Sequence, residues 1–217
     1  MKPALWIAVT LASAAWAETT HFDSSKTGSL PAGWTSAMTH EGGPPRWEVV
    51  KDNSAPSAPN ALAQWSDDNT SRRYPLAIYD HANIKDGEVR VQFKPISGAK
   101  DQAGGIVWRY RDPDNYYIVR ANALENNVVL YKVQNGERKS LAPKGRPPDA
   151  YGVPQDVPKQ TWSELRIVFQ GNQHTVFFNG TKLFDVEDST FPDAGKIGLW
   201  TKADSVTHFD DFSFQGK

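Results

Sequence analysis

The 217-residue sequence contains no cysteine. This absence excludes disulfide bridges, and it also excludes anchoring through a lipidated N-terminal cysteine. A chain of this length can bury enough apolar surface to be stable without covalent cross-links. The protein must therefore depend on a packed core, and the sequence has to contain the elements that build it.

An excess of charge of either sign is also missing. The chain has 24 Lys and Arg residues, or 23 without Lys2, against 25 Asp and Glu residues. This balance gives no electrostatic attraction to nucleic acid or to an anionic membrane. We therefore expect neither as a partner.

Long apolar runs are absent except at the N-terminus. Lys2 is followed by an apolar run from Ala4 to Ala15, which ends in Ala15-Trp16-Ala17. A charged start, a short apolar run and a small-x-small end are the parts of a secretory signal peptide. We expect residues 1–17 to be cleaved and residues 18–217 to form a single domain that does not insert into a membrane. The protein is then expected to be secreted or periplasmic.

No helical periodicity longer than about three turns occurs after residue 17. Apolar residues instead alternate with a period of two at 89–93, 165–169 and 197–199. The pairs Asn135-Gly136 and Asn179-Gly180 favour tight hairpins, because both residues tolerate a positive φ. Strands that recur about every 8–15 residues predict an all-β fold of two packed antiparallel sheets. Residues 143–160, with five prolines and two glycines, are predicted to form a long surface loop.

Common reaction motifs are missing as well. The five histidines have no metal-ligand spacing, and no Gly-rich phosphate loop or Gly-x-Ser-x-Gly elbow occurs. We expect no cofactor and no bound metal. Near the C-terminus, Phe209 and Phe212 are three residues apart before Phe214 restores the alternation, which predicts a β-bulge at Asp210-Asp211.

The most informative segment is AGGIVWRYRDPDNYYIVRANALENNVVLYKV, residues 103–133. It reads as three strands separated by turns. An unpaired Arg120 cannot lie in a dry core, so the face that carries it must point outward. The predicted core face of residues 116–122 therefore consists of Tyr117, Val119 and Ala121. The predicted shared outer surface consists of Arg109, Tyr116, Arg120 and Asn122.

This outer surface has the residue types of a binding site. Arginine offers a planar fork of donors, and tyrosine offers a ring and a hydroxyl. Together they suit a polyhydroxylated or anionic ligand. The alternative is a solvated face on which the arginines form cross-strand ion pairs. Of the tryptophans, we expect Trp47, Trp108 and Trp162 to lie in the core.

The 103–133 segment and the later GKIGLWTKADSVTHFDDFSF (195–214) resemble exported bacterial proteins of the concanavalin A-like lectin/glucanase superfamily. The sequence is most similar to the 3-keto-disaccharide hydrolase branch, over about residues 86–215. The resemblance implies a two-sheet antiparallel jelly roll whose concave face binds or cleaves glycans. Trp200 and Lys202 would then join Arg109, Tyr116, Arg120 and Asn122 as ligand-binding residues.

Catalytic residues stay unassigned. Laminarinase-type relatives carry a Glu-x-Asp-x-x-Glu or Glu-x-Asp-x-Glu strand, and the nearest sequence here is Asp185-Val186-Glu187-Asp188. Hydrolysis by that retaining two-carboxylate mechanism is therefore not expected. Glu125 and Asp114 are the carboxylates at the two ends of the Tyr116 strand. In some relatives an Asp on the last strand binds a structural Ca²⁺, which makes Asp210 the alternative to the expected absence of metal.

Three functions remain open from the sequence. The first is a carbohydrate-interacting domain that binds a glycan or glycoside on its concave face. The second is an enzyme of the 3-keto-disaccharide hydrolase type, which would need a general acid or base beside Arg109 and Arg120. The third is a structural or adhesion module, favoured if loop 143–160 or ion pairs fill the concave face.

Overall fold

The computed structural model describes residues 18–217, and the predicted signal peptide lies outside the described residues. Within this range the chain forms strands and turns without a helix, so no helix there could cross a membrane. The strands are β1 (Glu18–Thr20), β2 (Trp34–Thr39), β3 (Trp47–Lys51), β4 (Asn60–Gln64), β5 (Tyr74–Ile84), β6 (Gly87–Ser97), β7 (Ala103–Asp112), β8 (Asn115–Asn122), β9 (Asn127–Gln134), β10 (Glu137–Ser140), β11 (Val153–Pro154), β12 (Ser163–Gln170), β13 (Gln173–Phe178), β14 (Thr181–Glu187), β15 (Gly195–Trp200) and β16 (Val206–Gly216).

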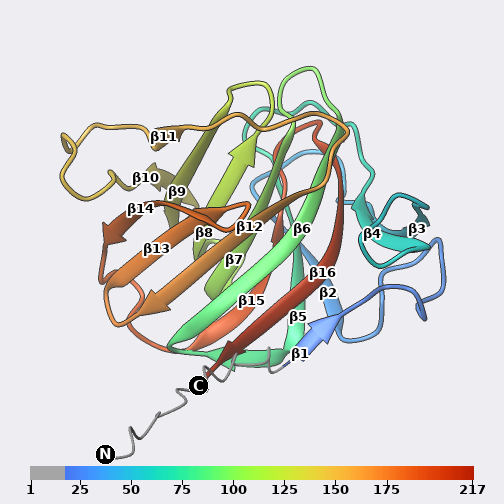
Figure 1. Ribbon diagram of the computed structural model, residues 1–217, viewed down its shortest axis with the longest axis horizontal. Helices are drawn as coiled ribbons and strands as arrows, with labels where there is room; N and C mark the ends of the chain where they lie inside the picture. Colours follow the sequence, from blue (N-terminus) through green and yellow to red (C-terminus); the bar gives the residue numbers. More distant parts are fainter. Residues whose placement is uncertain (1–17) are drawn as a thin grey trace, which may run out of the picture.

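These strands form two antiparallel sheets that pack face to face (Figure 1). The β6 sheet has the order β14-β13-β12-β6-β16-β4-β3, and β1 pairs with β16. The β8 sheet has the order β10-β9-β8-β7-β15-β5-β2, and β11 pairs with β9. The predicted all-β, two-sheet antiparallel jelly roll is confirmed.

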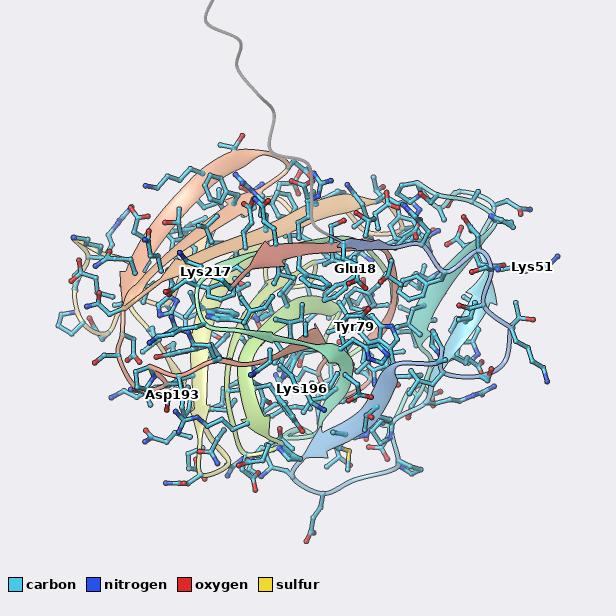
Figure 2. All side chains as sticks on the ribbon, turned by 90° about the horizontal axis from the view of Figure 1, so that it is seen from below. Glu18, Lys51, Tyr79, Asp193, Lys196 and Lys217 are labelled. Atoms are coloured by element: carbon cyan, nitrogen blue, oxygen red, sulfur yellow. The ribbon has the colours of Figure 1, made fainter. Side chains whose placement is uncertain are left out.

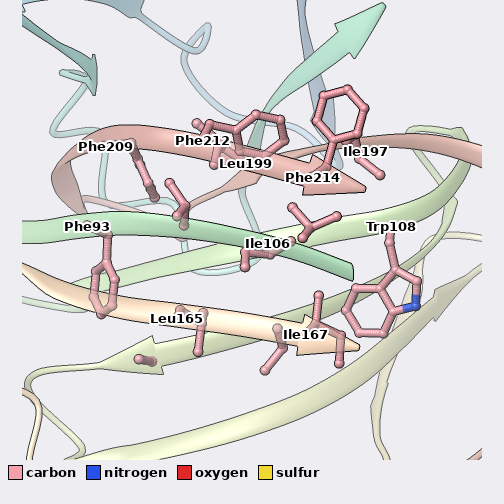
Figure 3. Packing of buried hydrophobic residues seen from close by; sticks show 14 of the residues in the cluster. Phe93, Ile106, Trp108, Leu165, Ile167, Ile197, Leu199, Phe209, Phe212 and Phe214 are labelled. Carbon is pink, nitrogen blue, oxygen red and sulfur yellow. The ribbon is translucent and has the colours of Figure 1, made fainter. Parts of the chain in front are cut away.

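The core lies between the sheets and is built from the alternating apolar positions. Phe93, Leu165 and Ile167 of the β6 sheet meet Ile106 and Leu199 of the β8 sheet (Figure 3). Each is fully buried, and such burial stabilises the fold by about 1.5–3 kcal/mol for a large apolar side chain. Tyr117, Val119 and Ala121 belong to this core, as predicted.

Two of the three predicted core tryptophans are also confirmed. Trp47 and Trp108 are buried, and the Trp108 ring stacks on Tyr117 with a centroid distance of 5.4 Å. Trp162 is only partly buried, so its assignment to the core was wrong. It lies just before β12, so the alternation of inward and outward side chains in that strand does not apply to it. Its ring lies instead under the ammonium group of Lys94.

Local turn chemistry follows the sequence closely. Asn135, Gly136, Asn179 and Gly180 all have positive φ angles, and they form the two-residue loops of the β9–β10 and β13–β14 hairpins. The predicted bulge is present on β16, where the register shifts between Asp210 and Ser213. The shift lets Phe209 and Phe212 both point into the core.

The chain from residue 143 to 160 is a long surface loop, as predicted, and its Val153 and Pro154 pair with β9. It runs beside β9 and β10 at the end of the β8 sheet (Figure 1). At the opposite side of the fold, β1 pairs with β16. There, Tyr79 of β5 donates a hydrogen bond to the carboxylate of Glu18 (Figure 2).

Candidate functional site

The outer face of the β8 sheet carries a second apolar cluster, separate from the core. Tyr116 and Trp200 face this side, as predicted, but both side chains are fully buried. The Tyr116 hydroxyl is 2.7 Å from Oγ1 of Thr39. The ring of Trp200 packs against Tyr74, with centroids 5.4 Å apart. Trp200 is therefore not an exposed platform for a ligand.

Arg138 of β10 is the side chain that covers this cluster. Its guanidinium carbon lies 4.8 Å from the ring centroid of Tyr74, 4.4 Å from that of Tyr131 and 5.6 Å from that of Trp200. Cation–π contacts of this kind are favourable and become stronger when water is excluded. The sequence alternation could not show this cover, because it comes from a neighbouring strand.

Arg109 does not share a surface with Arg120, and the prediction that it does was wrong. The register of β7 and β8 shifts between Trp108 and Asp112, and Arg109 has a φ of 47°. This irregularity breaks the alternation, and Arg109 turns towards the backbone at the end of the sandwich. Its guanidinium donates to the carbonyl oxygens of Phe191 at 2.7 Å, Gly171 at 2.8 Å and Lys85 at 3.0 Å. Arg109 therefore has a structural role, because it connects the backbones of three loops.

Arg120 lies at the centre of a polar network on the outer face of β8. The side chain is 1% exposed. Its Nη2 donates to Oε2 of Glu125 at 2.7 Å and to the hydroxyl of Tyr151 at 3.0 Å, and its Nη1 donates to Asn127. The Tyr151 hydroxyl is in turn 2.5 Å from that of Tyr131. The buried charge is thus paired and hydrogen-bonded, as burial of a cation requires.

Asn122 extends this network towards β15. Its Nδ2 donates to Oδ1 of Asp101 at 2.7 Å and to Oε1 of Glu125 at 3.2 Å. Lys202 Nζ is 2.6 Å from the other carboxylate oxygen of Asp101. We call this group the Arg120 network, which consists of Asp101, Arg120, Asn122, Glu125, Asn127, Tyr131, Tyr151 and Lys202. Three of the predicted binding residues, Arg120, Asn122 and Lys202, are thus brought together.

The loop before β7 holds Asp101 in place. The carboxylate of Asp204 accepts hydrogen bonds from the backbone N–H groups of Ala99, Lys100 and Asp101, at 2.7–3.1 Å. The sequence did not identify Asp101 and Tyr151 as site residues, because both lie in loops without a periodic pattern. Position 151 does fall inside the loop predicted at 143–160.

Two groups of the network, Glu125 and Tyr131, have shifted pKa values. Burial acts most strongly on Glu125 and raises its pKa, but the charge and hydrogen bond of Arg120, with a hydrogen bond from Asn127, outweigh burial and lower the pKa overall. Burial also raises the pKa of the Tyr131 hydroxyl far above its usual value. Glu125 is therefore an anionic acceptor and Tyr131 a neutral hydroxyl. Glu125 is not poised to act as a general acid at pH 7.

The rim of the network is apolar and exposed. Within residues 18–217, the exposed large apolar side chains are Trp65, Leu124 and Tyr151, at 39%, 37% and 48% exposure. Tyr151 contacts Arg120 directly, and Leu124 adjoins Glu125 in the chain, where its N–H bonds to Asn122. The site thus combines a fixed polar floor with an accessible ring.

The other carboxylates considered from the sequence lie elsewhere. Asp114 is exposed at the opposite end of β8. Asp185 and Glu187 lie on β14, at the edge of the other sheet, where they pair with Lys182 and Lys144. Neither of these two reaches the Arg120 network.

Asp210 and Asp211 form a cluster with His21 on the outer side of the β6 sheet. One ligand atom from each residue lies within 4.8 Å of the others. Asp210 is fully buried, its Oδ1 has no hydrogen-bond partner, and burial raises its pKa to about 6. The two carboxylates fit the oxygen preference of Ca²⁺, whereas the imidazole, already bonded to Asp211 at 2.8 Å, does not. The residues thus fit a calcium site only in part.

Comparison with solved structures places the chain among jelly-roll folds. It is similar to a carbohydrate-binding module, CBM66, from Bacillus subtilis, with a TM-score of 0.63 and 18% identity over 85% of this chain and 96% of that one. It is also similar to the cellulose-induced protein Cip1, with a TM-score of 0.61 and 13% identity over 92% and 97% of the two chains. A Bacillus subtilis protein of unknown function with a galectin-like fold gives a TM-score of 0.51 and 14% identity over 84% and 88%. At these identities the similarity establishes the fold.

A search of curated protein sequences gave no match. The sequence profile of one family, in contrast, matches nearly the whole described chain, over residues 18–215. The segment similarity noted for residues 86–215 is thereby extended to β1. The protein belongs to the family of 3-keto-alpha-glucoside-1,2-lyase-like domains.

Proposed function

We propose that this domain is exported and binds a glycan or glycoside at the Arg120 network, on the concave outer face of the β8 sheet. The observation that carries the proposal is the exposed ring of Tyr151 beside the partly exposed carboxylate of Glu125, both fixed by the buried guanidinium of Arg120. Donors and acceptors fixed in this way need no reordering when a ligand binds.

The chemistry of the network matches a polyhydroxylated ligand. Glu125 offers a partly exposed carboxylate acceptor and Lys202 a partly exposed charged donor, while the buried Arg120 and Asp101 hold these two groups in place. Each sugar hydroxyl both donates and accepts, so an alternating set of this kind satisfies it. The exposed Tyr151 ring supplies the apolar contact that sugar rings favour. The carbohydrate-binding module among the structural neighbours supports the same class of ligand.

Isothermal titration with a panel of oligosaccharides and 3-keto-glucosides tests the proposal. Tyr151→Ala and Glu125→Gln are expected to weaken binding by about tenfold or more each, as for a central contact. Asp149→Asn is the matched control, because Asp149 is exposed in the same loop, and it should bind as the wild type does. Absence of binding by any saccharide would contradict the proposal and favour a structural module.

A second candidate is a lyase that acts on 3-keto-α-glucosides. The family name and one further observation favour it: Glu125 is an ionised, partly exposed carboxylate beside the fixed charge of Arg120. Glu125 would take the proton from C2, which the neighbouring ketone acidifies. The C2 electron pair would form the C1–C2 double bond as the C1–O bond breaks. The leaving oxygen would take up a proton, and no water is consumed.

The lyase reaction gives a conjugated enone, which can be followed by ultraviolet absorbance. A 3-keto-α-glucoside incubated with the wild type should give this product without incorporation of solvent oxygen. Glu125→Gln should abolish turnover, whereas Asp114→Asn, at the far end of β8, should leave the rate unchanged. A product of hydrolysis, or no product at all, would exclude the lyase.

A further inference from the structure

Trp65 follows β4 on the outer side of the β6 sheet, and it is the exposed large aromatic that the Arg120 network does not use. Its indole is 39% exposed. The backbone N–H of Trp65 donates to the carbonyl of Arg46 at 2.8 Å, and its ring packs on His208 with centroids 5.7 Å apart and an interplanar angle of 35°. One face of the indole ring therefore packs on His208, while the rest of the ring is accessible to solvent.

The residue beneath Trp65 is itself fixed. His208 is 7% exposed, and its Nδ1 is 2.8 Å from Oδ2 of Asp52. The same carboxylate forms an ion pair with Lys94, whose ammonium group lies 5.0 Å from the ring centroid of Trp162. A chain of paired groups thus holds His208 in place under the indole. The orientation of the Trp65 ring is therefore fixed by the residues that pack beneath it.

A groove of about 390 Å³ opens beside the indole. Its apolar walls are Ile96 and Val206, and its polar groups belong to Arg46, Asp67 and Ser97. The side chain of Arg46 is 61% exposed, and its Nη2 pairs with Glu48 at 3.1 Å, so its remaining donors face solvent. An aromatic ring, a cation and an anion therefore border one hollow.

We propose that this groove is a second carbohydrate-contact site, in which one sugar ring stacks on Trp65 while Arg46 and Asp67 bond to its hydroxyl groups. An exposed ring with donors and acceptors around it matches the apolar face and hydroxyl edge of a sugar. The charges of opposite sign favour a neutral ligand over an anionic one. The site lies on the sheet opposite to the Arg120 network and does not depend on it.

Titration of the ¹⁵N-labelled protein with glucose hexasaccharides of α-1,4, β-1,4 and β-1,3 linkage tests this site. The indole N–H signal of Trp65, identified by its loss in Trp65→Phe, should shift saturably with at least one hexasaccharide. Trp65→Ala should abolish this binding, followed by backbone signals of residues 96 and 97. Arg46→Ala should weaken it about three- to tenfold, the loss expected for hydrogen bonds from a charged group. Lys51→Ala, an exposed cation at the end of β3, should leave it unchanged.

This experiment tests the two proposed binding sites independently of each other. Tyr151→Ala and Glu125→Gln should leave the Trp65 shift intact, whereas Trp65→Ala should leave ligand binding at Tyr151 intact. If no hexasaccharide moves the Trp65 signal, or if Trp65→Ala binds as the wild type does, the second site is excluded. Backbone spectra confirm that each variant is folded.

Discussion

The hydroxyl of Tyr151 accepts a hydrogen bond from Nη2 of Arg120 at 3.0 Å, so a loop residue contributes to the pairing of a buried cation on the sheet. Two further partners of this guanidinium, Glu125 and Asn127, come from the β8–β9 hairpin. Arg120 therefore links the loop to the strands, which gives it a measurable role in stability as well as in binding.

Arg120→Ala should destabilise the fold by about 3 kcal/mol, because it leaves Glu125 and Asn127 without their partner in a partly buried site. Urea unfolding measures this change. Arg111→Ala is the control: Arg111 pairs with Asp193 where both side chains are exposed, and its loss should cost at most about 1 kcal/mol. Equal effects of the two substitutions would show that the Arg120 network does not stabilise the fold.

His174 should make the protein sensitive to mild acid. The imidazole is fully buried, and burial lowers its pKa to about 4. The native state therefore holds the imidazole neutral. Its contribution to the stability of the fold is complete above the unfolded pKa near 6.5 and is lost as pH falls towards 4. Between pH 7.5 and 5, wild-type stability should fall by about 2 kcal/mol relative to His174→Gln. Parallel pH profiles of the two proteins would contradict this.

Asp210 should act in the opposite direction. Its pKa is raised to about 6, so the protonated native form is favoured below the unfolded pKa near 4, and this stability is lost as pH rises through 6. Asp210→Asn should therefore stabilise the protein by about 2–3 kcal/mol more at pH 8 than at pH 4. EDTA should leave the melting temperature unchanged. A lower melting temperature in EDTA, together with destabilisation by Asp210→Asn, would instead identify a bound cation.

Gly105→Ala should destabilise the β8 sheet. A Cβ atom at this position would lie 2.5 Å from Cδ1 of Ile118 and 2.7 Å from the carbonyl oxygen of Val119. Because the second contact is with backbone, strands β7 and β8 must shift, at a cost of about 1–3 kcal/mol. Thermal unfolding measures the loss. Ser36→Ala, at an exposed position of β2, should change stability by at most about 0.5 kcal/mol.

The sequence predicted those features that depend on strand alternation and turn chemistry. Tyr117 and Val119 face the core because side chains alternate strictly along β8. Arg109 was misplaced because a bulge interrupts that alternation, and no residue type announces it. Alternation does not reveal strands β1, β2 and β11, since β1 and β11 are short and β2 has small, polar residues.

The candidate site was predictable only in part, for a similar reason. Arg120 and Asn122 could be grouped because they share one face of β8, whereas Lys202, which follows β15 two strands away, joined them through the family resemblance. The burial of Trp200 could not be foreseen, because Arg138 reaches it from β10. Asp101 and Tyr151 enter from loops, where contacts depend on the tertiary fold and leave no periodic pattern.

The loop that carries Tyr151 is bonded to the strands near its two ends: the Lys144 N–H donates to the carbonyl of Asp185 on β14 at 2.7 Å, and Val153 and Pro154 pair with β9. The remaining partners of Arg120 lie in the hairpin itself and do not depend on that loop. Residues 145–151, which lie between these two attachments, can therefore be exchanged for another sequence while the sandwich stays intact. Such an exchange would change which group meets Arg120, so that ligand preference in this scaffold can evolve, or be engineered, one loop at a time.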